Sequence, residues 1–78
     1  MKSILVIGMG KFGHHLVNEL IADGNNEIMI IDKNESQIRD MFSVVTSARV
    51  GDCTNPDVLK SLGVKNFDII IVDRRVFK

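Results

Sequence analysis

The sequence has little of what marks membrane, secreted or metal-binding proteins. Its apolar runs, such as residues 4–7 and 69–72, are far shorter than the roughly 20 residues of a membrane helix. The N-terminus enters a strand pattern directly, without the apolar segment of a secretory signal. The one cysteine, Cys53, has no partner for an internal disulfide and no Cys or His neighbour at metal-ligand spacing. We therefore expect a cytosolic protein with no metal site.

Net charge and low-complexity sequence are also absent. Ten basic residues balance ten acidic residues, and no Lys/Arg run is dense enough to attract nucleic acid or an anionic membrane by itself. Apolar residues make up 45% of the 78 residues and there is one proline, which is typical of a folded domain rather than a disordered chain. We expect a single domain over residues 1–78 with no nucleic-acid partner.

Short β-rich runs alternate with segments of helical period. The runs at residues 3–7, 27–32 and 68–72 are nearly continuous in Ile, Val, Leu and Met, as in strands buried on both faces of a parallel sheet, and a weaker run lies at 48–51. Between the first two runs, one helical face carries Phe12, Leu16, Val17, Leu20 and Ile21. Gly24 and Asn25 supply the C-terminal stop of this helix.

Two further helices are predicted in the second half of the chain. Apolar residues at i, i+3, i+4 and i+7 predict a helix with an inward face formed by Ile38, Met41, Phe42 and Val45. Asn55, Pro56 and Gly63 supply the cap, first position and C-terminal stop of a shorter one. This strand–helix order predicts an α/β, Rossmann-type parallel sheet, in the order 3-2-1-4, with helices on both faces.

A glycine-rich segment follows the first predicted strand and opens the first predicted helix. It matches the pattern G-x-G-x-x-G with Gly8, Met9, Gly10, Lys11, Phe12 and Gly13. Glycines at these positions permit a tight turn, a close approach of backbone to a pyrophosphate, and close packing of helix on sheet. At Met9 only the backbone is needed. The phosphates of a dinucleotide would lie at the helix N-terminus, where Lys11 adds a positive charge.

An acidic residue ends the second predicted strand at the spacing of roughly 20 residues that the dinucleotide fingerprint requires. This residue, Asp32, would accept hydrogen bonds from the ribose hydroxyls, and its charge would repel a 2′-phosphate. The pattern therefore favours NAD, ADP or ATP over NADP, although the neighbouring Lys33 weakens that preference. The alternative interpretation is that the glycines serve turn and packing geometry alone.

The segment after the weak strand at 48–51 indicates which family of Rossmann-type domains the chain resembles. Residues 51–59, 62–64 and 67–72, together with the glycine motif and Asp32, resemble the TrkA-N domains, also called RCK or KTN domains, along essentially the whole chain. The resemblance implies a cytoplasmic, oligomeric regulatory domain that binds NAD(H), ADP or ATP and controls a membrane potassium transporter or channel at the inner face of the membrane. It also implies that Asp52, Cys53 and Thr54 line the adenine side of the site. Cys53 replaces the family's usual alanine, and Lys11 stands where arginine is common.

The C-terminal end departs from the family pattern, in which more strands and a helix follow. We expect a C-terminally truncated domain, or one whose missing half comes from another chain, with a solvated tail that includes Arg74 and Arg75. The strand at 69–72 would then be an unprotected edge through which the chain self-associates. His14 and His15 point about 100° apart on a helix, so we assign them no joint role.

No residue type at a suitable place predicts catalysis, so we do not expect an enzyme. Two alternative functions remain open from the sequence. The chain could be the cofactor-binding part of an NAD-dependent dehydrogenase, or an assembly module that uses the fold without binding nucleotide.

Overall fold

The computed structural model of the chain describes residues 2–72 and 75–77. Its secondary structure runs in the order β1 (Lys2–Ile7), α1 (Lys11–Asp23), β2 (Asn26–Asp32), η1 (Glu35–Gln37), η2 (Arg39–Met41), β3 (Ser47–Val50), α2 (Pro56–Leu62), η3 (Val64–Asn66), β4 (Ile69–Val72) and β5 (Arg75–Phe77), where η marks a 3-10 helix. In the part of the chain that is described, no helix has the length and apolarity needed to cross a membrane.

The strands form one sheet in the order β3-β2-β1-β4-β5. Neighbouring strands among β1 to β4 are parallel, and β1 is paired along both edges, with Ile4 opposite both Ile28 of β2 and Ile69 of β4. The predicted 3-2-1-4 order of the parallel strands is therefore confirmed. The Rossmann-type α/β class is confirmed with it, because each crossover carries helical structure.

The predicted open edge at β4 is wrong. β5 returns antiparallel along β4, pairing Ile70 with Phe77 and Val72 with Arg75. The chain thus covers the edge through which we expected self-association, and residues 75–77 form a strand rather than a solvated tail. A three-residue strand of mixed polarity carries too little periodicity to be read from sequence. Arg74, the other arginine assigned to that tail, lies outside the described residues.

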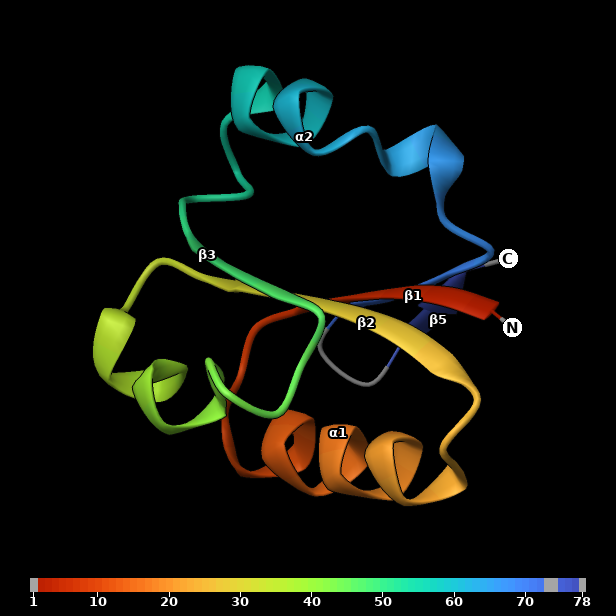
Figure 1. The fold of residues 1–78 in the computed structure, drawn as a ribbon. Coiled ribbons are helices and arrows are strands. Elements are labelled where there is room, and N and C mark those ends of the chain that lie inside the picture. Colours follow the sequence, from red (N-terminus) through yellow and green to blue (C-terminus); the bar gives the residue numbers. More distant parts are fainter. Residues whose placement is uncertain (1, 73–74, 78) are drawn as a thin grey trace.

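Helical elements cover both faces of the sheet (Figure 1). α1, η1 and η2 lie on one face, and α2 with η3 lies on the other. The larger core is on the α1 side, where β-strand residues such as Ile4, Val6 and Ile30 pack with Val17 of α1 and Ile38. A smaller core on the α2 side is built on Leu5, Ile31 and Leu62.

The predicted helix around residues 38–45 is replaced by two 3-10 turns. Ile38 and Met41 are buried as expected, but Ile38 has φ −122° and ψ −6°, which interrupts the helical backbone between η1 and η2. Phe42 is 50% exposed, and the sequence after it, Ser43 to Thr46, is rich in β-branched residues with low helix propensity. Two apolar side chains at helical spacing are therefore buried here without a continuous α-helix.

The predicted helix ends are confirmed. The Asn55 side chain accepts a hydrogen bond from the Asp57 N–H, and Pro56 occupies the first turn of α2. Gly24 and Gly63 end α1 and α2 in the left-handed conformation, with φ 76° and 67°. These caps fix where each helix meets the next strand.

Candidate functional site

Two adjoining clefts lie at the carboxyl ends of the parallel strands. One, of about 380 Å³, is lined by residues 8–13 and Asp32. The other, of about 320 Å³, is lined by the ends of β1, β2 and β4 and by residues 51–54. Gly8 and Asp32 line both clefts. An open α/β sheet offers this edge to ligands, because the loops that follow its strands converge there.

The glycine loop has the geometry that its three glycines predict. Gly8 has φ +89°, a conformation that side chains with a β-carbon rarely adopt. A β-carbon on Gly10 would meet nothing within 4 Å, so the backbone there faces open space in the cleft. A β-carbon on Gly13 would lie 2.6 Å from the carbonyl oxygen of Gly8. Gly13 therefore lets α1 approach the loop, and Gly10 leaves the backbone accessible.

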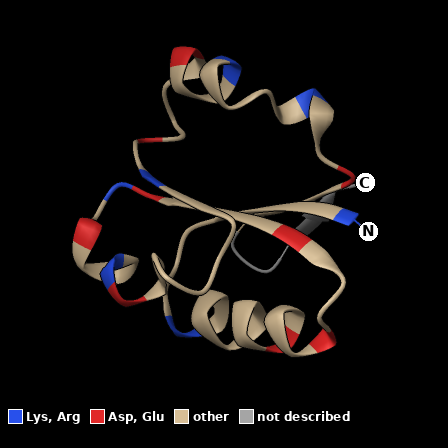
Figure 2. Ribbon diagram, viewed as in Figure 1, with Lys and Arg blue, Asp and Glu red and all other residues tan. Residues whose placement is uncertain are grey.

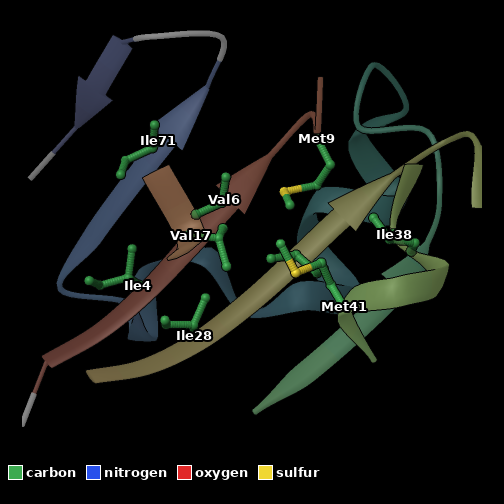
Figure 3. Packing of buried hydrophobic residues seen from close by; sticks show 9 residues of the cluster. Ile4, Val6, Met9, Val17, Ile28, Ile38, Met41 and Ile71 are labelled. Carbon is green, nitrogen blue, oxygen red and sulfur yellow. The ribbon is translucent and has the colours of Figure 1, made fainter. Parts of the chain in front are cut away.

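Met9 is not the neutral position that the motif predicts. Its side chain is 0% exposed and belongs to the core cluster on the α1 side. Figure 3 shows it on the same side of the sheet as Val6, Val17 and Met41. Met9 can therefore offer a ligand only its backbone, and its side chain anchors the loop. The signal in the sequence was that this position carries an apolar residue instead of a polar one, and that signal is weak on its own.

Asp32 connects the second strand to the glycine loop. Its Oδ2 atom accepts a hydrogen bond from the Met9 N–H at 2.7 Å, and its Oδ1 atom accepts one from the Asn34 N–H at 2.8 Å. The Gly8 N–H also donates to the Ile31 carbonyl at 2.9 Å. The carboxylate is partly buried between the two clefts. The structure thus brings Asp32 to the glycine loop, as the fingerprint predicts.

Two lysines border the clefts with their side chains exposed. Lys11 opens α1 beside Gly10, and Lys33 follows Asp32. α1 is 13 residues long and has no acidic residue in its first turn, so no carboxylate of α1 itself offsets the positive end of its dipole. Phe12 is 40% exposed and lines the cleft of the glycine loop instead of packing inward as predicted. Figure 2 shows that both charge signs occur around this end of the sheet.

The loop after β3 forms the wall of the second cleft. The Asp52 Oδ1 atom accepts hydrogen bonds from the N–H and the hydroxyl of Thr54, at 2.9 and 2.7 Å, and these bonds hold the pKa of Asp52 below its ordinary value. Cys53 is half-buried and packs against the α2-side core. Burial raises the pKa of the Cys53 thiol, and the charges of Asp52 and Asp32 raise it further. Because it packs against this core, the thiol is a packing group.

Comparison with known proteins matches residues 4–75 to the TrkA-N domain. The chain belongs to the TrkA-N domain family. It is 38% identical over 71 residues to Ktr system potassium uptake protein C of Bacillus subtilis (strain 168), covering 91% of this chain and 32% of that protein. It is 37% identical over 71 residues to Ktr system potassium uptake protein A of the same organism, with the same coverage.

A more distant TrkA-N relative is Trk system potassium uptake protein TrkA of Vibrio alginolyticus. It is 30% identical over 69 residues, which are 87% of this chain and 15% of that protein. The chain thus spans about a third of the length of the Ktr relatives and less of the Trk relative.

Some residues that line the clefts of this TrkA-N domain were not singled out from the sequence. The apolar floor of the second cleft is formed by Ile7, Ile31 and Val72. Gly51, which belongs to the segment that carries the family resemblance, completes this floor. A β-carbon on Gly51 would lie 3.2 Å from Ile31 Cδ1 and 3.3 Å from Val58 Cγ1. Each strand residue is the last or next to last of its strand, so position at the sheet's carboxyl edge was the available signal.

The two adjacent histidines do not converge, as the helical geometry predicts. His14 Nε2 lies 3.6 Å from Asp40 Oδ1, and His15 Nε2 lies 3.8 Å from Glu19 Oε1. Among the described residues there is no group of three or more His, Cys, Asp or Glu side chains that could hold a metal ion.

Proposed function

We propose that this TrkA-N domain binds an adenine nucleotide, NAD(H) or ADP/ATP, and acts as a cytoplasmic regulatory domain without catalytic activity. The observation that carries this proposal is the pair of clefts that share Gly8 and Asp32 at the carboxyl edge of the sheet. A nucleotide is a ligand with two chemically different ends. One cleft offers backbone and a helix N-terminus, and the other offers an apolar floor.

The phosphates are assigned to the cleft of the glycine loop. The accessible backbone at Gly10 allows close approach, and the N-terminus of α1 favours negative charge. The exposed Lys11 supplies a positive charge, and Phe12 lines the same cleft. Gly8 and Gly13 set the shape of the loop, and Met9 contributes its backbone.

The nucleoside is assigned to the second cleft. Asp32 would accept the ribose hydroxyls, since each carboxylate oxygen can accept more than one hydrogen bond. The adenine would lie on the apolar floor against the loop of Asp52, Cys53 and Thr54. The exposed Lys33, at the rim of the cleft, would donate hydrogen bonds to a phosphate or to a ribose substituent.

The experiment is a calorimetric titration of the chain with NAD, NADH, ADP and ATP. We expect saturable binding of at least one of them, and loss of that binding in Asp32→Ala. Glu35→Gln, which removes a nearby carboxyl outside both clefts, should bind as the wild type does. Failure of all four ligands to bind the folded wild-type chain would contradict the proposal.

The proposed partner is a membrane potassium transporter or channel subunit, with the domain assembled as a homo-oligomer. The support is that the relatives named above are potassium uptake proteins and that the match covers most of this chain. The test is a chimera in which residues 1–78 replace the matching segment of Ktr system potassium uptake protein C. The chimera should sustain potassium uptake in cells that lack that protein, and Gly10→Ala within it should impair the uptake. Equal uptake with and without Gly10→Ala would contradict nucleotide control.

A further inference from the structure

We propose that Asp32 is a positioning residue as well as a ligand contact: together with Met9 it holds the glycine loop in its binding shape before any nucleotide arrives. This inference rests on the proposed function, because it concerns the loop assigned to the phosphates. A carboxylate at this position could bind ribose hydroxyls without contacting the glycine loop. Here it is already bonded to the loop itself.

A hydrogen bond joins the glycine loop to the end of β2, two segments far apart in the sequence. Asp32 Oδ2 accepts the Met9 N–H at 2.7 Å, at the short end of the range for N–H···O contacts. Asp32 Oδ1 accepts the Asn34 N–H at 2.8 Å, which fixes the orientation of the carboxylate. Asp32 thus holds the second residue of the loop from the end of β2.

Met9 is also held by its side chain. Its side chain is fully buried in the core, and its sulfur atom lies 3.3 Å from where a β-carbon on Gly13 would be. Rotation of the peptide between Gly8 and Met9 would therefore break the bond to Asp32 or pull the side chain out of the core. Met9 and Asp32 together form what we call the loop clasp.

The clasp has a consequence for affinity. A loop that must be ordered when the ligand binds costs free energy, and a loop already ordered does not. Asp32 also keeps acceptor positions for ribose, because a carboxylate has about four of them. Removing the carboxylate should therefore lower the affinity both for ligands that carry ribose hydroxyls and for ligands that lack them.

The test compares ADP with 2′,3′-dideoxy-ADP, which has no ribose hydroxyl for Asp32 to accept. If Asp32 were a ribose contact alone, Asp32→Ala would leave the affinity for the dideoxy compound unchanged. The clasp predicts a loss of about tenfold for that compound, the size expected for one hydrogen bond to a charged group. Asp32→Asn, whose amide oxygen can still accept from Met9, should recover part of the loss. An unchanged affinity for dideoxy-ADP in Asp32→Ala overturns the proposal.

A second readout needs no nucleotide. Hydrogen exchange at the Met9 amide, followed by NMR in the ligand-free chain, should be at least about tenfold faster in Asp32→Ala than in the wild type. The amide of Ile30 in the middle of β2 should keep its exchange rate in a variant that remains folded. Glu35→Gln is the control variant, because it also removes a nearby carboxyl group and should leave the Met9 rate unchanged. An unchanged Met9 rate in both Asp32→Ala and Asp32→Asn overturns the clasp. A faster Met9 rate in a chain that binds none of the nucleotides supports the clasp and contradicts the proposed function.

Discussion

Gly13 packs so closely on Gly8 that an added β-carbon would lie 2.6 Å from the Gly8 carbonyl oxygen. The contact is between the first turn of α1 and the backbone of the loop before it, so neither side can relax by a rotamer change. It separates the glycines into one that the fold requires and one, Gly10, that borders open space.

The variants Gly13→Ala and Gly10→Ala should therefore fail in different ways. Gly13→Ala should lower the free energy of unfolding by about 1–3 kcal/mol, because the methyl group meets backbone. Gly10→Ala should cost less than about 1 kcal/mol, since φ of −68° suits alanine and no atom is near, yet its methyl group would block the approach of phosphate. Urea unfolding and ADP titration of both variants measure the two effects. Equal losses of stability would contradict this assignment.

A second prediction concerns acid stability. Asp68 Oδ2 accepts hydrogen bonds from the N–H and the hydroxyl of Ser3, at 2.9 and 3.2 Å, and these bonds lower the pKa of Asp68 from its ordinary value of 3.8. Because the folded-state pKa is the lower one, the contribution of Asp68 to stability is present above pH 3.8 and is lost as the pH falls through the folded-state value. Asp68→Asn should flatten the decline of the unfolding free energy below that pH.

The measurement is urea unfolding of wild type and variant from pH 7 down to about pH 2, the range in which carboxyl groups titrate. Asp57→Asn is the control, since Asp57 lies on α2 away from the Ser3 contact. If Asp68→Asn follows the same acid decline as the wild type, the Ser3 contact does not contribute in the way described.

The cap of α2 gives a third prediction. The Asn55 side chain accepts a hydrogen bond from the Asp57 N–H at 2.9 Å, so Asn55→Ala leaves that donor without its partner. We expect a loss of about 1 kcal/mol, which in a domain of this size lowers Tm by roughly 4–8 °C. Asn55→Asp should keep the cap, because a carboxylate accepts the same bond and suits the helix N-terminus. Thermal unfolding by circular dichroism distinguishes the two, and equal Tm values for both variants would count against the cap.

A fourth prediction concerns the reactivity of Cys53. Because burial raises the pKa of its thiol above the ordinary 9.0, little of it is thiolate near neutral pH. Alkylation by iodoacetamide at pH 8 should be several times slower in the folded chain than in urea, with a midpoint of the rate above pH 9.0. ADP should slow it further, since Cys53 lines the cleft proposed to hold the nucleoside. Alkylation as fast in the folded as in the unfolded chain would contradict the burial argument.

The parallel part of the fold was predictable because its signals are local and agree with one another. Apolar runs predicted the four parallel strands, and Asn55, Gly24 and Gly63 predicted where helices begin and end. Residues 38–45 were harder, because buried side chains at helical spacing also fit two 3-10 turns, and β-branched residues beyond Phe42 disfavour continuation.

The sequence predicted which residues gather at the carboxyl edge of the sheet, but not the contacts that they make there. The glycine motif and its spacing to Asp32 located the carboxyl edge of the sheet. That Asp32 would bond to the Met9 backbone, and that Met9 would be buried, depends on how the loop folds over the core. β5 escaped notice for a related reason, since a short strand is specified by the neighbour it pairs with.

The two clefts should also differ in how often the loops that line them open, because these loops follow strands at different positions in the sheet. The glycine loop follows β1, which is paired on both edges at the centre of the sheet. The loop of residues 51–54 follows β3, the last strand of the sheet, whose residues are largely exposed. Local opening of a protein concentrates where backbone is exposed and few apolar contacts are made. If the nucleotide binds as proposed, its phosphates occupy the steadier cleft and its adenine the cleft that fluctuates more, so a bound ligand should reduce motion mainly in the loop of residues 51–54.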